Sequence, residues 1–342
     1  SVTFIALPAL GNISIGAHGN VGIQDVLFAN PLYGKGSDKK LVTLMSPNIS
    51  NEEALSKLSK GNNRVIADVK LTILAVGFRG LGGYNTVEVN ARVQTGTSIP
   101  YELFALARSV GTPQQNIGNI NMNAEAFGEI ALGHSHKIND KVTVGGKLKF
   151  LIGGARVDYA MKNLKADLKG QDEWVLSRET QLDAYVKGLE YVSSTKTYDY
   201  HKDAQGKPQT YQKVTDIKVN NGGVNGFGLA FDLGAEWKIN NDWKLSGSVL
   251  DLGFIAWGTN AQLVNRSNSV VFKGFKEAKA KGNDEGSFTE QLNALKDDFM
   301  DFASMKDNSQ SSNKVTGIGA TVNVGVEYTL PVYRSIYFGL PS

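Results

Sequence analysis

Two short groups of side chains in this 342-residue chain could bind a metal ion. His134 and His136 are two residues apart, a spacing that places both imidazoles on one face of a strand. Asp297, Asp298 and Asp301 carry the carboxylate oxygens that calcium prefers. No third ligand lies near the histidines in sequence, and the aspartates lack the spacing of an EF-hand loop. We therefore prefer a structural interpretation, with interfacial side chains for the histidines and a solvated helix face for the aspartates.

The sequence carries no other pattern typical of catalysis. It has no cysteine, which excludes disulfides, a thiol nucleophile and cysteine zinc sites. No Gly-x-Ser-x-Gly elbow stands between a predicted strand and a predicted helix, and no glycine-rich phosphate loop precedes a helix. The formal net charge of +3 is too small for a nucleic-acid interface. We expect a protein that is not an enzyme, has no cofactor or metal, and does not bind nucleic acid.

The elements that would position any site are β-strands. Apolar and polar residues alternate with a period of two, which predicts strands with two chemically different faces. The alternation is clearest in residues 87–95, 122–132, 142–152, 227–238 and 318–328, and it is weaker in 11–17 and 65–75.

Such strands fit either a large soluble β-sandwich with buried apolar faces or a transmembrane β-barrel with apolar faces toward lipid. The mean hydropathy of −0.21 and the lack of a long apolar run argue against a transmembrane helix, but not against a barrel. Three features favour the barrel: the strands are long, the polar faces carry small residues, and the connections alternate between very short and very long. We predict an all-β fold, an antiparallel transmembrane β-barrel that forms a single domain over residues 1–342.

The two faces of the predicted strands separate apolar from charged residues. We expect outer-membrane lipid to contact the apolar face, at Val87, Val89, Ile130, Leu132, Phe150, Leu229, Phe231, Leu233, Val322 and Val324. We expect the charged face to line the lumen, at Asp68, Lys70, Glu88, Arg92, Glu125, Glu129, Lys147, Lys149, Asp232, Glu236, Lys238 and Glu327. Both signs of charge are present, which favours cross-strand pairs that brace the interior over an ion-selective ring. An interfacial aromatic girdle is predicted at Trp237, Trp243, Tyr328 and Tyr333.

The connections predict an orientation. Tight turns are predicted near residues 79–83, 137–141, 238–242 and 329–333, because Asn, Asp and Gly supply the positive φ that hairpins need. The long connections at 20–62, 98–116, 156–222 and 258–312 lie at the other end of the strands. Bacterial barrels have short periplasmic turns and long outer loops, so we predict a bacterial outer-membrane protein with these long connections outside. Short helices are expected in them, after Ser50, over 101–110 and over 287–305, and a strand pair within 172–200.

Five short motifs carry a resemblance to a known family. They are LPALGNI at 7–13, FRGLGGYN at 78–85, ALGHS at 131–135, GKLKFL at 146–151 and LDLGFIAW at 250–257. The chain resembles a family of Bacteroidota outer-membrane barrels of unknown function, similar to PorV-type barrels of type IX secretion and distantly to FadL-type transporters. The resemblance implies a barrel of about 14 strands and lipopolysaccharide as a neighbour, and it implies no catalytic residues.

Two functions remain open from the sequence. The first is a structural or accessory subunit that docks a protein partner in an outer-membrane assembly, and the second is a FadL-like passive channel for a hydrophobic or amphiphilic small molecule. A surface enzyme is the least favoured. The predicted strand order also places an upward strand at the end of the chain, from which we expect about four further strands beyond residue 342.

Overall fold

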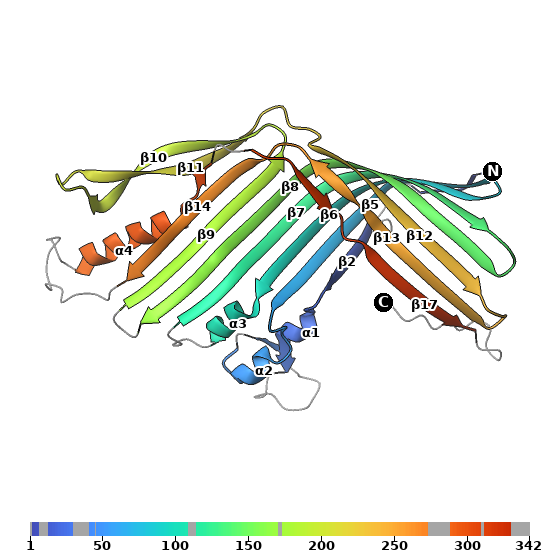
Figure 1. Ribbon diagram of the computed structural model, residues 1–342, viewed down its shortest axis with the longest axis horizontal. Helices are drawn as coiled ribbons and strands as arrows, with labels where there is room; N and C mark the ends of the chain where they lie inside the picture. Colours follow the sequence, from blue (N-terminus) through green and yellow to red (C-terminus); the bar gives the residue numbers. More distant parts are fainter. Residues whose placement is uncertain are drawn as a thin grey trace.

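The protein folds almost entirely as antiparallel β-structure, as the sequence predicts (Figure 1). The computed structural model describes residues 2–6, 13–29, 41–44, 46–108, 114–169, 173–272, 288–308 and 311–329. Within these residues the main sheet has 13 strands, and two further sheets have two strands each.

A curved wall of neighbouring antiparallel strands forms the centre of the main sheet. Its order is β1-β5-β6-β7-β8-β12-β13-β16, with β2 also pairing β5 and β17 also pairing β13. The bounds are β1 (Val2–Ala6), β2 (Ile13–Gly19), β5 (Asn62–Gly80), β6 (Gly83–Pro100), β7 (Gln114–Lys137), β8 (Val142–Lys169), β12 (Gly226–Lys238), β13 (Trp243–Trp257), β16 (Lys314–Gly317) and β17 (Thr321–Tyr328).

The two edges of this wall do not meet in the described part of the chain. One edge is formed by β1 and β2, and the other by β16 and β17, with no pairing between them among the described residues. The antiparallel all-β architecture is confirmed, and closure of the sheet into a transmembrane barrel stays a prediction. The further strands predicted after residue 342 and the turn residues 330–333 lie outside the described residues.

Three of the predicted hairpin turns are confirmed, and each has a local chemical cause. Between β5 and β6, Leu81 and Gly82 have φ of 52° and 75°, the left-handed pair of a type I′ turn. In the β7–β8 turn, the side-chain oxygen of Asn139 accepts hydrogen bonds from the amides of Lys141 and Val142. Asn240 repeats this arrangement between β12 and β13. These Asn side chains tighten the turns and fix the strand register.

Strand β8 is far longer than the sequence pattern predicts, so the expected connection at 156–222 is wrong. The strand has 28 residues, which at about 3.3 Å per residue spans about 90 Å. Its first half pairs β12, and its second half pairs β9 (Glu173–Val186). The alternation changes phase at a register shift opposite Ala126 and Phe127 and again near Asn163, where φ is 53°. These irregularities hide the continuing strand from a period-two analysis.

The far end of the long strands carries a projecting region. There β9 pairs β14 (Ala261–Phe272), which pairs β15 (Lys306–Asp307). A separate ribbon of β10 (Leu189–Lys202) and β11 (Pro208–Val219) lies above it, and helix α4 (Phe288–Ala303) contacts both β10 and β14 (Figure 1). The strand pair predicted within 172–200 needs correction, because β9 and β10 each pair with other strands.

A small second core forms beside the start of β5 and the end of β6. It contains α1 (Ile23–Val26), β3 (Leu27–Ala29), β4 (Leu41–Thr43), α2 (Asn51–Leu55) and α3 (Tyr101–Arg108). The hydroxyl of Ser50 accepts a hydrogen bond from the Glu53 amide, which confirms the predicted cap of α2. Phe28, Leu44 and Ile49 are buried together in this core. Within the described residues, no helix is both long enough and apolar enough to cross a membrane.

Candidate functional site

The convex face of the sheet is apolar and exposed. The strand register places Val89, Ile130, Phe150 and Leu229 side by side across four strands. Leu233 and Val322 both lie opposite Val249 in a second row, and Val322 is 68% exposed. All ten residues predicted to face lipid occupy this convex face, at alternate positions to the charged ones.

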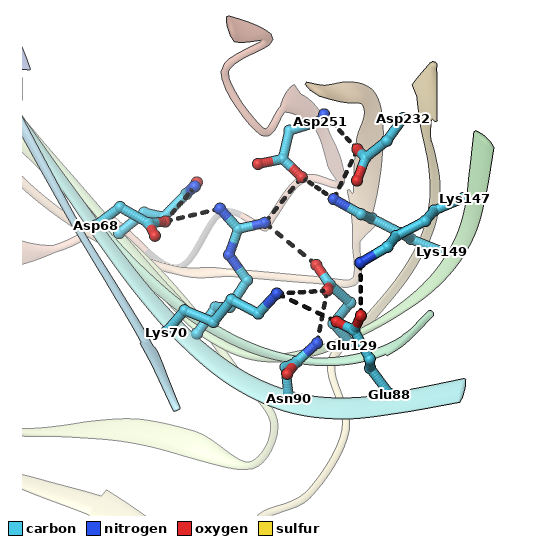
Figure 2. A network of polar contacts seen from close by, with 11 residues as sticks. Asp68, Lys70, Glu88, Asn90, Glu129, Lys147, Lys149, Asp232 and Asp251 are labelled. Atoms are coloured by element: carbon cyan, nitrogen blue, oxygen red, sulfur yellow. Dashed lines mark hydrogen bonds and ion pairs between the residues drawn. The ribbon is translucent and has the colours of Figure 1, made fainter. Parts of the chain in front are cut away.

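The concave face instead gathers charged side chains from six strands into one network (Figure 2). Arg92 on β6 lies at its centre and is only 6% exposed. Its guanidinium binds Asp68 at 2.8 Å, Asp251 at 2.9 Å and Glu129 at 3.2 Å. Glu129 also accepts a hydrogen bond from the Asn90 amide group at 2.9 Å. One buried cation therefore ties together carboxylates from β5, β7 and β13.

Lys149 on β8 extends the network to β12. Its ammonium lies 2.7 Å from Asp232 and 2.6 Å from Asp251. The backbone amide of Asp251 donates to the Asp232 carboxylate at 2.8 Å, so the two acids are held on either side of one lysine. Buried carboxylates of this kind are tolerated only when cations and hydrogen bonds compensate them.

Two lysines close the network on its more open side. Lys147 binds Glu88 at 2.5 Å, and Lys70 binds the same carboxylate at 3.5 Å. These lysine side chains are 33% and 28% exposed, in contrast to the buried Arg92 and Lys149. The network thus has a buried layer and a layer that remains accessible from one side.

Asp251 is the charged residue of this network that was not predicted from the sequence. It sits at a bulge in β13, where residues 250 and 251 together oppose Asp232, and its φ of 59° is left-handed. Aspartate tolerates this conformation better than most residues. A signal was present, because the outward apolar residues Val249 and Leu252 are three apart instead of two. That phase change marks a bulge, and a bulge can turn an extra side chain inward.

A buried apolar layer follows the network along the concave face. Phe127, Leu151, Ala230, Ile255 and Trp257 pack there, and the Arg92 guanidinium lies over the Phe127 ring at 5.4 Å. Beyond this layer lies a second ionic cluster, in which Arg156 binds Glu125 and Asp158, and Lys314 binds Asp158 at 2.7 Å. Arg156 and Asp158 were also missed, because they fall in the segment 156–222 that was predicted to be a connection, and Lys314 was missed because it precedes the strand pattern predicted at 318–328.

The remaining predicted side chains lie near the turns. Glu236 and Lys238 are exposed on β12, and Glu327 pairs with Lys244 at 3.4 Å. The ring centroids of Trp243 on β13 and Tyr328 on β17 are 4.5 Å apart, and Trp237 is exposed on β12, which pairs with the other edge of β13. Tyr333 lies outside the described residues. The lumen, lipid and interface assignments themselves stay predictions.

A cavity of about 700 Å³ lies on the concave face between the network and the turns. Its hydroxyl lining comes from Ser14, Tyr84, Thr86, Ser135, Thr143 and Ser248. Lys70, Lys147 and Asp232 of the network reach its wall, as does Glu236. The arrangement can offer hydrogen bonds and charges of both signs to a bound molecule.

The two groups considered as metal ligands have other partners. The rings of His134 and His136 stack 6.2 Å apart, and His134 shares a hydrogen bond with Asn85. The prediction of a solvated aspartate face is wrong for Asp297, which is 3% exposed and accepts a hydrogen bond from the Tyr200 amide. No group of three or more His, Cys, Asp or Glu side chains in the described part of the chain is arranged to hold a metal ion.

These features define an all-β protein whose main sheet has an apolar convex face and an ionic network on its concave face. The chain belongs to a family of unknown function (DUF5723), which matches residues 1–342. No curated protein and no solved structure matches the chain. The predicted links to Bacteroidota, to PorV-type barrels and to FadL-type transporters stay predictions.

Proposed function

We propose that the chain is a bacterial outer-membrane β-barrel protein that acts as a non-enzymatic structural or accessory subunit of an outer-membrane assembly. The observation that carries this proposal is that the wall exposes its apolar face and buries charged side chains on its other face, the reverse of a soluble protein. Apolar side chains are exposed over the convex face, whereas Arg92, Glu129 and Lys149 are buried on the concave face. In a soluble protein this arrangement would expose a large apolar surface to water. In a barrel it matches lipid outside and polar groups inside.

Barrel closure is part of this proposal. Edge strands in lipid would leave backbone amides and carbonyls without partners, at a cost of several kcal/mol each. The edges at β2 and β17 therefore have to be covered in the membrane, and closure of the sheet on itself is the arrangement we propose.

An accessory role is supported by how the interior is filled. The ionic network joins six strands, and the apolar layer around Trp257 follows it directly. A molecule that passes along the concave face would have to displace both the ionic network and the apolar layer. The projecting region, by contrast, offers a surface to a protein partner, which is formed by the β10–β11 ribbon, helix α4 and the ends of the long strands.

A ribbon deletion tests the accessory role. The ends of the ribbon are close together, since the Asn220 amide donates to the Gly188 carbonyl at 2.7 Å. Replacing residues 189–219 by a short Gly-Ser turn should leave the wall intact. Extraction of the native protein in mild detergent should recover a stoichiometric partner, and the deletion should lose it. A second deletion, of residues 23–55, serves as the control and should retain the partner. Repeated recovery of the full chain as a lone monomer would contradict the proposal.

A passive channel for a hydrophobic or amphiphilic molecule is the alternative. The cavity of about 700 Å³ on the concave face favours a channel for an amphiphilic molecule over one for a purely apolar molecule, because its charged and hydroxyl groups could bind a polar end. This alternative requires the Arg92 network to open. Bound lipid in native mass spectra, released when Phe127 is enlarged to Trp, would support the channel over the accessory role.

A further inference from the structure

The cavity between the ionic network and the turns has a lining unlike that of most small-molecule sites. Ligand pockets are usually lined by apolar and aromatic side chains with a few polar groups. Here hydroxyl-bearing and charged side chains make up more than half of the lining residues, beside glycines and the apolar side chains of Val144, Leu233, Ala235 and Leu250, and Tyr84 contributes one phenol ring. An apolar ligand would remove these groups from water and return no hydrogen bonds, so the cavity disfavours it.

The charges of the lining balance. Four are cationic and four anionic: Lys70, Arg92, Lys147, Lys149, Asp68, Asp232, Glu236 and Asp251. All except Glu236 take part in ion pairs within the described structure. A ligand with a net charge would have to break one of these pairs or lie against a like charge. An uncharged polar ligand can accept from the lysines and donate to the carboxylates while the pairs stay intact.

One buried group of the lining also has an unused donor. The Nε of Arg92 has no hydrogen-bond partner in the described part of the chain, although the residue is 6% exposed. This nitrogen has almost no accessible surface, so a ligand in the cavity would instead meet the part-exposed ammonium groups of Lys70 and Lys147.

We propose that this cavity binds a short, uncharged oligosaccharide. Sugar hydroxyls both donate and accept, which suits the hydroxyls of Thr86 and Ser248 and the charges of both signs. The Tyr84 ring offers an apolar surface for the C–H face of a sugar ring. The volume of about 700 Å³ lies within the range of small-molecule sites, and it has room for more than one sugar ring. The site goes beyond the proposed function and does not depend on the protein being an accessory subunit.

Isothermal titration of the full chain in detergent tests this site. Maltotriose and chitotriose are the neutral probes, and laurate and glucose 6-phosphate are the apolar and anionic comparators. We expect saturable binding of at least one neutral trisaccharide, tighter than that of either comparator. Thr86→Val and Ser248→Val each remove one hydroxyl with little change of shape and should raise Kd about fivefold or more.

Ser246→Val is the matched control. Ser246 lies two residues from Ser248 on the same face of β13, but it does not line the cavity. Its substitution should leave Kd unchanged. Failure of both trisaccharides to bind overturns the proposal, as does tighter binding of laurate or glucose 6-phosphate. Equal binding by all three valine variants also overturns it, since the sugar would then sit elsewhere. Each outcome leaves the partner experiment on the ribbon unaffected.

Discussion

Arg92 should be the most sensitive single residue of the wall. Its guanidinium makes three charged hydrogen bonds, to Asp68, Glu129 and Asp251, and it is almost fully buried. Arg92→Met keeps much of the packing volume but leaves the three carboxylates without their shared cation. Breaking one buried ion pair in this way costs roughly 3–5 kcal/mol. We expect the free energy of unfolding to fall by about that amount, because Lys149 remains to compensate Asp251.

Urea unfolding of refolded protein in detergent or lipid, followed by tryptophan fluorescence, measures this change. Arg79→Met is the control, since Arg79 is exposed at the end of β5 and should change stability by about 0.5 kcal/mol or less. Glu129→Gln in the Arg92→Met background should recover part of the loss, because it removes an uncompensated carboxylate. We expect a coupling energy of about 1.5 kcal/mol or more in this double-mutant cycle. Equal stability of Arg92→Met and Arg79→Met would refute the reasoning.

Three further predictions address a turn, the membrane face and the projecting region. Leu81 is 87% exposed with φ of 52°, so Leu81→Asn should raise the free energy of unfolding by up to about 1 kcal/mol in the same urea assay, and a loss would contradict the turn assignment. Phe231→Arg should impair membrane insertion at a cost of roughly 2–4 kcal/mol, and Asp232→Arg should impair insertion less. The amount of each variant in the membrane fraction measures this, and a larger loss for Asp232→Arg would contradict the assignment of the convex face to lipid. Burial and the nearby Asp301 carboxylate hold the pKa of Tyr198 well above its usual range. The stabilisation from this neutral phenol is complete below about pH 10 and is lost as the pH rises through the raised pKa. Tyr198→Phe should therefore remove one phenol that ionises late in an absorbance titration. An unchanged titration would contradict the contact between Tyr198 and Asp301.

Period-two alternation was enough to predict the wall but not the projecting region. The strands around Val89, Ile130 and Leu229 alternate without interruption, and the turns at Asn139 and Asn240 carry their own signals. Strand β8 continues past Gly154 only after a register shift, which reverses the phase of the pattern. Pairing partners far apart in sequence, such as β9 with β14, leave no local signal at all.

The sequence predicted most of the charged residues of the ionic network, but it did not predict which of them pair. Eight of the predicted lumen charges meet in the network, because alternate residues on adjacent strands share a face. Which charges pair depends on strand register, and the register follows from the turns. Asp251 was missed because its inward position comes from a bulge, where one extra residue turns the side chain to the other face.

The most direct test of the central claim is the environment of each face in a lipid bilayer. The chain has no cysteine, so single-cysteine variants can be spin-labelled without further changes. Labels at residues 229, 231 and 233 on the convex face, and at 230, 232 and 234 on the concave face, can be compared for collisions with oxygen and with a water-soluble nickel complex. We expect high oxygen and low nickel accessibility at the odd positions, and the opposite ratio or full burial at the even ones. High nickel accessibility at Leu229, Phe231 and Leu233 in reconstituted vesicles would contradict it.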